Sequence, residues 1–105
     1  MSSNIQRKQK TLSIMVSDEL SIYSVSALGG EIMRQLPEVE KITVDLSQVT
    51  EMDSAGLQLL IAIKNLQTEY AVEFVGHTSA VLEVLDVCGM AGEFNDSDSM
   101  ISAVQ

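Results

Sequence analysis

The chain has 105 residues, 46% of them hydrophobic, so it can form one core but is too short for two ordinary domains. Its net charge of −9 excludes nucleic acid as a ligand, because phosphate binding needs a basic face and the chain has six Lys and Arg residues in total. The longest apolar run, Leu59 to Ile63, is far shorter than the roughly 20 residues that span a bilayer, so we expect a cytoplasmic protein without direct membrane insertion.

The N-terminal part of the chain predicts a tail followed by a hairpin. Residues 1–10 are polar and rich in Ser, Gln and Lys, so we expect a flexible tail there and a folded domain over residues 11–105. Thr11–Val16 alternates apolar and polar side chains, which predicts a strand. Leu20–Ile22 is predicted to pair with it across a turn at residues 17–19.

The middle of the chain alternates helix, strand and helix. Between Tyr23 and Leu36 the apolar residues recur at helical spacing, and the pattern ends before Pro37, which cannot continue a helix. Lys41–Leu46 is a run of β-branched and aliphatic residues, which predicts a buried strand followed by a polar connection. An apolar helix is predicted from Ser54 to about Tyr70.

The C-terminal part continues this alternation. The expected elements are a strand at Ala71–Val75, a helix capped by Thr78 or Ser79 and ended by Gly89, a short strand near Phe94 and a terminal helix from Asp96 to Val104. An opening hairpin followed by alternating helices and strands predicts a single α/β domain. We expect a mixed sheet of four to five strands with about four helices packed on it.

A serine hydroxyl lies where the polar connection turns into the apolar helix, in the segment Met52–Leu57. Ser54 or Asp53 can cap this helix by accepting hydrogen bonds from its free backbone amides. A phosphate on Ser54 would instead lie at the positive end of the helix dipole, and its charge would act on any partner docked there. The residues alone leave both interpretations open.

The chain resembles a known family in this region. Ile42–Leu46, the seven-residue connection after it and Asp53–Leu57 resemble the core signature of STAS domains, the family of the bacterial anti-sigma-factor antagonists. The resemblance covers most of the chain and implies a STAS-like α/β domain that binds proteins and has no catalysis of its own. In these antagonists the serine after the aspartate of the Asp-Ser-[Ser/Thr/Ala]-Gly-Leu loop is the phosphoacceptor, which implies that role for Ser54.

The resemblance also implies partners. Unphosphorylated antagonists bind an anti-sigma factor that is also a serine kinase, phosphorylation releases them, and a phosphatase resets the cycle. Asp53 would contact or orient the kinase. Family antagonists usually carry Gly-Glu-Leu-Asp between the first strands, where this chain reads Asp18-Glu19-Leu20-Ser21, so Ser21 takes the place of an aspartate that lies near the phosphoacceptor.

The helix after Ser54 predicts a docking face. At about 100° per residue, Ser54, Leu57 and Ile61 align on its outer side. The side expected to face the sheet carries Leu59, Ala62, Ile63, Leu66 and Tyr70. An alternative, favoured for Leu57, is that neighbouring elements cover the outer side chains. The candidate partner-binding residues are Ser21, Asp53, Ser54, Ala55, Gly56, Leu57, Gln58 and Ile61.

No residue pattern supports catalysis, a metal or a cofactor. A serine nucleophile needs a nearby general base, and the only histidine, His77, is expected in an exposed turn after a different strand. Met52 stands where the Gly-x-Ser-x-Gly motif requires glycine. Cys88 has no partner at zinc-ligand spacing and is expected to pack in the core. We therefore expect a protein that is not an enzyme, with no cofactor and no metal.

A second class of function stays open. STAS domains also occur as constitutive subunits of chemotaxis-type signalling arrays and of lipid-transport complexes, where the serine need not be phosphorylated. A switch requires Ser54 to be exposed, whereas a purely structural cap predicts a buried or hydrogen-bonded hydroxyl. The sequence leaves the oligomeric state undetermined.

Overall fold

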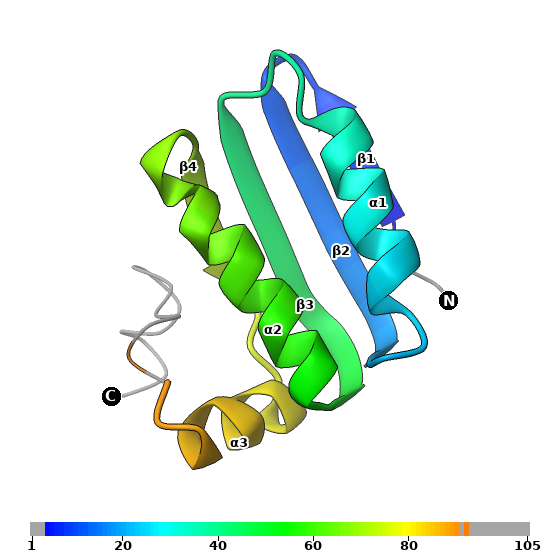
Figure 1. Cartoon of the computed structure of the whole chain (residues 1–105), viewed down its shortest axis with the longest axis vertical. Coiled ribbons are helices and arrows are strands. Elements are labelled where there is room, and N and C mark those ends of the chain that lie inside the picture. Colours follow the sequence, from blue (N-terminus) through cyan, green and yellow to red (C-terminus); the bar gives the residue numbers. More distant parts are fainter. Residues whose placement is uncertain (1–3, 91, 93–105) are drawn as a thin grey trace.

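In chain order, the elements of the computed structural model are β1 (Asn4–Lys8), β2 (Thr11–Leu20), α1 (Val25–Gln35), β3 (Lys41–Met52), α2 (Ser54–Lys64), the 3₁₀ turn η1 (Asn65–Thr68), β4 (Ala71–Val75) and α3 (Ser79–Val87). The structure describes residues 4–90 and residue 92 (Figure 1). The strand predicted near Phe94 and the helix predicted from Asp96 lie outside the described residues.

The four strands form one mixed sheet in the order β1-β2-β3-β4. β1 is antiparallel to β2, whereas β2, β3 and β4 are parallel to one another. Parallel neighbours need crossover connections, which α1 and α2 provide, and both helices lie over the same face of the sheet (Figure 1). The α/β fold with a mixed sheet is therefore confirmed. The carboxyl ends of β2 and β3 lie side by side, close to the starts of α1 and α2.

The core lies between the sheet and the helices. Side chains alternate along β2 and β3, so every second one faces the helices and is buried, while those between them face the opposite side. The buried strand residues on this face include Leu12, Ile14, Val16, Ile42, Val44, Leu46 and Phe74. They pack against Leu28 and Ile32 of α1, Leu57, Leu60 and Ile63 of α2, and Val81 and Leu85 of α3.

The N-terminal prediction is wrong in two respects. Asn4–Lys8 forms β1 rather than a flexible tail, and it pairs with β2 with Ile5 opposite Ile14. The opening hairpin is therefore β1–β2, and Leu20 belongs to the far end of β2 instead of starting a second strand. β1 lacks an apolar pattern because it is an edge strand with four exposed side chains and one half-buried one, that of Ile5.

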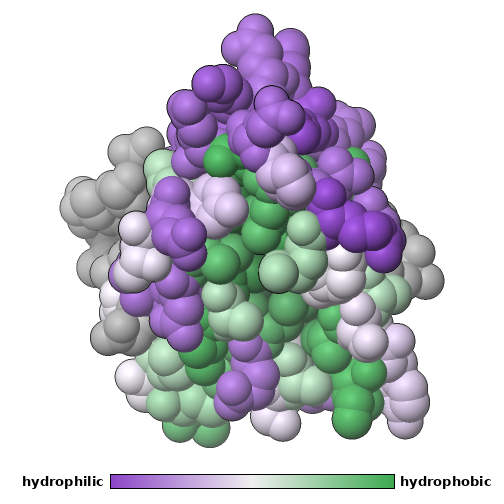
Figure 2. Space-filling model, turned by 45° about the horizontal axis from the view of Figure 1, so that its top comes forward, coloured by the Kyte–Doolittle hydropathy of each residue, from purple (hydrophilic) through white to green (hydrophobic). Residues whose placement is uncertain are grey.

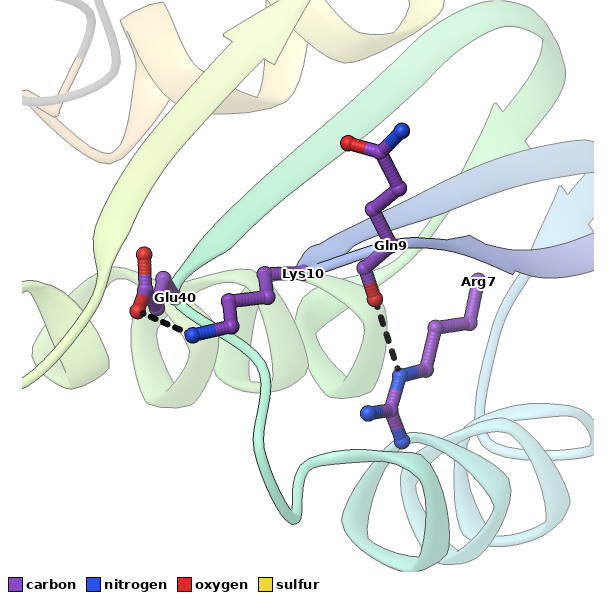
Figure 3. A network of polar contacts seen from close by, with 4 residues as sticks. All are labelled: Arg7, Gln9, Lys10 and Glu40. Carbon is purple, nitrogen blue, oxygen red and sulfur yellow. Dashed lines mark hydrogen bonds and ion pairs between the residues drawn. The ribbon is translucent and has the colours of Figure 1, made fainter.

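Polar contacts fix the turn between β1 and β2 (Figure 3). Gln9 adopts a left-handed backbone with φ 57°, and its carbonyl accepts a hydrogen bond of 3.3 Å from Arg7 Nε. Lys10 Nζ forms an ion pair of 3.2 Å with Glu40 on the connection that precedes β3. These groups are exposed, so each contact contributes little to stability. They mark the end of the molecule opposite Ser54.

β3 is longer than predicted. The segment expected to be a polar connection continues the strand to Met52, where it pairs with the second half of β2, and Leu20 lies opposite Met52. Val49 is fully buried within this polar stretch, which explains why pairing continues. The chain consequently reaches Asp53 directly from a strand rather than from a loop.

α2 is shorter than predicted, because the α-helix ends at Lys64 and continues as η1. Its buried side includes Leu60, which is fully buried, whereas Ala62 is exposed and Leu59 is only half-buried. Of the side chains predicted to face the sheet, Ile63 is buried in the core, and Leu59, Leu66 and Tyr70 are half-buried and pack against it. The prediction is wrong for Ala62, and it missed Leu60.

β2 contains an irregularity near its carboxyl end. Its register with β3 shifts between Asp18 and Glu19, and Asp18 adopts a left-handed backbone with φ 65°. Thr50 Oγ1 donates a hydrogen bond of 3.1 Å to the Asp18 carbonyl and holds the bulge. Asp18 occupies the position where the resemblance places glycine, the residue that adopts positive φ without steric cost.

We expect Asp18→Gly to raise the free energy of unfolding by up to about 1 kcal/mol, because glycine removes the Cβ penalty at positive φ. Urea unfolding followed by circular dichroism measures the change. Glu19→Gly is the matched control, since Glu19 has no positive φ and glycine there should destabilise the strand. Equal losses in the two variants would contradict the role of the backbone at Asp18.

Candidate functional site

The start of α2 is organised by Asp53. Asp53 has an extended backbone, and its Oδ1 accepts a hydrogen bond of 3.0 Å from the Gly56 amide, so it is the N-cap of the helix. Ser54 is the first residue of α2. The sequence left open which of the two residues caps the helix, and the structure assigns the cap to Asp53.

Asp53 also binds the loop between β2 and α1. Its Oδ2 accepts a hydrogen bond of 3.2 Å from the Ile22 amide, and its own amide donates to the Leu20 carbonyl at 3.3 Å. The hydrogen bond from the Gly56 amide, and to a smaller extent the one from the Ile22 amide, lowers the pKa of the Asp53 carboxyl group below its usual value. Both hydrogen bonds favour the charged form of the carboxyl group. One carboxylate thus joins the start of α2 to the loop before α1, across 31 residues of sequence.

Replacing Asp53 by asparagine should lower the urea midpoint at neutral pH, since the amide nitrogen of asparagine cannot accept the hydrogen bond from Ile22. A lowered folded-state pKa means that the stabilising contribution is present above the unfolded-state pKa and is lost as the pH falls through the folded-state pKa. The difference between wild type and variant should therefore shrink in acid. Urea unfolding from neutral to acidic pH tests this, with Glu83→Gln on the exposed surface of α3 as the control.

Two buried serines fix the loop itself. Ser24 Oγ accepts a hydrogen bond of 3.0 Å from the Ser21 amide and donates to the Glu19 carbonyl at 3.1 Å. Ser21 Oγ accepts from the Tyr23 amide at 3.2 Å. The side chain of Ser21, expected among the partner-binding residues, is directed into this network and is 6% exposed. It supports the loop and is not available for direct contact with a partner.

Gly56 and Leu57 are also buried and hold α2 against the sheet. A Cβ at Gly56 would overlap the Leu20 carbonyl oxygen and lie 2.9 Å from Met52 Cγ, so only glycine allows this approach of helix and strand. Leu57 is 4% exposed and belongs to the core, as the favoured alternative predicted. The apolar strip expected on the outer side of α2 is therefore not formed, because Leu57 is turned inward.

Ser54 itself lies on the surface. It is exposed, and its hydroxyl forms no hydrogen bond within the part of the chain that the structure describes. Asp53 and Gln58 are exposed beside it, whereas Ala55 and Ile61 are half-buried. The accessible part of the predicted site is therefore centred on Asp53 and Ser54, next to the end of β3.

The sequence missed two surface residues of this site. Ile22 is 66% exposed and Tyr23 is 88% exposed, although the pattern placed them in a strand and a helix. Both precede α1 in the loop that is bound to Asp53, so they lie beside the start of α2. The sequence did contain a signal for this exposed loop. Ile22 and Tyr23 are two large side chains between Ser21 and Ser24, and Ser21 is where the chain departs from the family motif.

The other reactive side chains lie elsewhere. Cys88 is exposed at the carboxyl end of α3, so the prediction that it packs in the core is wrong. His77 is half-buried in the connection between β4 and α3, not fully exposed. Among the described residues, no group of three or more His, Cys, Asp or Glu side chains could hold a metal ion. Within the same part of the chain, no helix is long and apolar enough to cross a membrane.

Solved structures share this fold. An anti-sigma factor antagonist from Mycobacterium paratuberculosis aligns with a TM-score of 0.76 and 22% identity, covering 98% of this chain and 92% of that one. The anti-sigma factor antagonist SpoIIAA in its unphosphorylated form gives 0.73 and 18%, covering 98% and 96%. The Bacillus cell fate determinant SpoIIAA in its phosphorylated form gives 0.70 and 17%, covering 99% and 100%.

Sequence comparison gives the family. No curated protein matches the chain. A family model described as "Mlab, STAS domain" matches residues 3–101, which include every element from β1 to α3 and the Asp53–Ser54 loop. The chain therefore belongs to the STAS domain family and has the fold of the anti-sigma-factor antagonists.

Proposed function

We propose that this protein is a non-catalytic regulator that binds a partner protein through the Asp53–Ser54 loop and is switched by phosphorylation of Ser54. One observation carries the proposal: the Ser54 hydroxyl is exposed and not hydrogen-bonded within the described residues, while Asp53 performs the capping. A kinase can reach such a hydroxyl, and the fold does not depend on it. The partner would be an anti-sigma factor, or a similar regulator, that is also the serine kinase for Ser54. A phosphatase would remove the phosphate.

The local structure supports a phosphate as a switch. The start of α2 tolerates negative charge, because its first amides point outward and the helix dipole is positive there. Phosphorylation should therefore leave the domain folded. A partner packed over Ser54 would have to bury the phosphate and the adjacent Asp53 carboxylate together, and removing two neighbouring anions from water is costly. The phosphate would consequently displace the partner.

The similar folds of SpoIIAA in its unphosphorylated and phosphorylated forms are consistent with such a switch. Both forms align with this chain over nearly its whole length. A phosphate is thus compatible with this fold in a relative, and we expect the same of the present chain.

Intact-mass spectrometry of the protein purified from its own cells, followed by fragmentation, tests the proposal. We expect a population with one added phosphate on Ser54 that disappears in Ser54→Ala. Ser79 is the internal control, because it is also exposed and is also the first residue of a helix. An unmodified population under every growth condition, or a phosphate on Ser79 instead, would contradict the switch.

A second candidate function is a constitutive subunit of a lipid-transport or chemotaxis-type signalling assembly. The family match supports it equally, because it rests on the STAS domain, which also occurs in such assemblies. In that case the loop would be a permanent interface. The two candidates differ in the effect of Ser54 phosphorylation on the complex. A permanent subunit should stay in its complex whatever the phosphorylation state of Ser54, whereas the switch should release its partner.

A further inference from the structure

The basic side chains of the molecule are concentrated at one end. β2, β3 and β4 are parallel, so their first residues and the last turns of α1 and α2 lie at one end, opposite Ser54 (Figure 1). All six basic residues of the chain lie at that end, in the β1–β2 hairpin, at the start of β3 or in the last turns of α1 and α2. They are Arg7, Lys8, Lys10, Arg34, Lys41 and Lys64. Strongly hydrophilic residues crowd the upper part of Figure 2, and apolar ones are more frequent below.

Three carboxylates at the basic end have cationic partners. Lys10 pairs with Glu40 at 3.2 Å and Lys41 pairs with Glu73 at 3.7 Å. Arg34 pairs with Glu31 one turn earlier in α1. The basic charge of the chain is therefore concentrated at one end, and we call the opposite end the Ser54 end and define it as residues 18–24 and 51–54.

The Ser54 end carries four exposed carboxylates and no basic residue. They belong to Asp18, Glu19, Glu51 and Asp53. Glu19 and Glu51 are direct partners on the neighbouring strands β2 and β3. Like charges in such positions repel and reduce stability. The fold thus keeps an unfavourable pair at the end of the sheet, which a cation from outside could relieve.

Large apolar side chains are exposed between these charges on a fixed backbone. Ile22 and Tyr23 project from the loop whose amides are bound by Asp53 and Ser21. A surface hollow of about 360 Å³ lies beside them, lined by Ser17, Asp18, Glu19, Tyr23 and Ser24. Carboxylates next to an exposed aromatic ring form a favourable environment for a lysine or arginine side chain.

We infer that the Ser54 end docks on a partner protein that presents lysine or arginine side chains around an apolar pocket. Ile22 and Tyr23 enter the pocket, and a basic side chain occupies the hollow beside Asp18 and Glu19. This inference rests on the proposed function and specifies the chemistry of its partner. The Ser54 ends of two copies do not fit each other, because they would bring only carboxylates together. An anionic membrane is disfavoured for the same reason.

The inferred basic contact lies in the hollow beside Asp18 and Glu19, and Ser54 is not among the residues that line this hollow. Partner binding and the switch are therefore separable. In this arrangement a phosphate at Ser54 would be buried under the partner without a counter-charge, so phosphorylation would weaken binding. In the alternative arrangement a basic residue of the partner lies directly over Ser54, and phosphorylation would strengthen binding. The sign of the effect of Ser54→Asp distinguishes the two arrangements.

Photo-crosslinking tests the inference on the full chain in its own cells. We place p-benzoylphenylalanine at Tyr23, and in a control at Met33, which is 64% exposed near the other end of α1. The expected result is a partner peptide crosslinked at position 23 only, with Lys or Arg residues flanking the contact. The yield should fall at least about tenfold in extracts between about 0.1 M and about 1 M salt, where the screening length drops from roughly 10 to 3 Å.

Glu19→Lys separates a binding role from a structural one. It should cut the yield at position 23 at least about tenfold while the urea midpoint stays equal or rises, because it turns a repulsive cross-strand pair into an attractive one. Glu38→Lys, an exposed carboxylate at the basic end, should change neither quantity. Ser54→Asp should abolish the crosslink if the proposed switch operates.

Several outcomes would overturn the inference. They are a contact peptide without basic residues, a crosslink to a second copy of the chain, the same products from both positions, or an unchanged yield in Glu19→Lys. A basic partner that is retained in Ser54→Asp would instead contradict only the phosphorylation switch and leave the docking surface in place.

Discussion

Gly56→Ala is expected to lower the free energy of unfolding by about 3 kcal/mol, at the upper end of the usual cost of overpacking. The new Cβ would overlap the Leu20 carbonyl oxygen and crowd the side chains of Leu20 and Met52. A backbone oxygen cannot move away by changing a rotamer, so α2 or the end of β2 must shift. Because Ser54 lies two residues earlier, the shift should also displace the docking loop. Urea unfolding measures the first effect, and the crosslink at position 23 the second.

Gly29→Ala is the matched control for this prediction. Gly29 lies inside α1, and an added Cβ would meet Leu59 Cδ1 at 3.5 Å, an ordinary contact. Alanine has the higher helix propensity, so this variant should be more stable by about 0.5–1 kcal/mol. Similar stability changes in the two variants would show that the approach of α2 to Leu20 is not as restrictive as the geometry indicates.

Ser54→Asp is expected to weaken partner binding by about a hundredfold, or about 3 kcal/mol, without unfolding the domain. The added carboxylate lies next to Asp53 under the docked partner, so two anions must be desolvated together. In the free protein the same charge is tolerated, because it lies in the first turn of α2, where the helix dipole offsets the repulsion from Asp53. Calorimetric titration with the partner identified by crosslinking measures the affinity, and urea unfolding measures the stability.

Two variants control this experiment. Ser54→Ala should retain the affinity of the wild type, since the hydroxyl forms no hydrogen bond with the described residues and Asp53 supplies the cap. Ser79→Asp introduces the same charge at the same helical position of α3, after the cap Thr78, and should leave the affinity unchanged. Full binding by Ser54→Asp would favour a permanent subunit over a switch.

Patterns within single elements were sufficient for much of the fold. The alternation from Leu12 to Val16 identified the first half of β2, and the strand Ala71–Val75 was predicted with its observed bounds. Thr78 was one of the two predicted caps of α3, and Gly89 follows that helix with φ 70°. These signals are local, because they depend on a residue's own backbone preference or on which side of one element is apolar.

Elements with few apolar residues were not recognised. β1 and the second half of β3 consist mainly of polar side chains, and each is a strand because a neighbouring strand supplies its hydrogen bonds. No local pattern records that pairing. The predicted end of α2 was wrong for a related reason, since the sequence does not show where an α-helix tightens into a 3₁₀ turn.

The amino-acid sequence by itself determined the α/β class, the family and the position of Ser54 at the start of a helix. Only the tertiary structure decided which side chains of the site face outward. Asp53 reaches across 31 residues to the Ile22 amide, so the exposed loop and the start of α2 become one surface. Gly56 brings that helix against Leu20 and turns Leu57 into the core. Contacts between segments distant in sequence set these orientations, and periodicity within one segment contains no information about them.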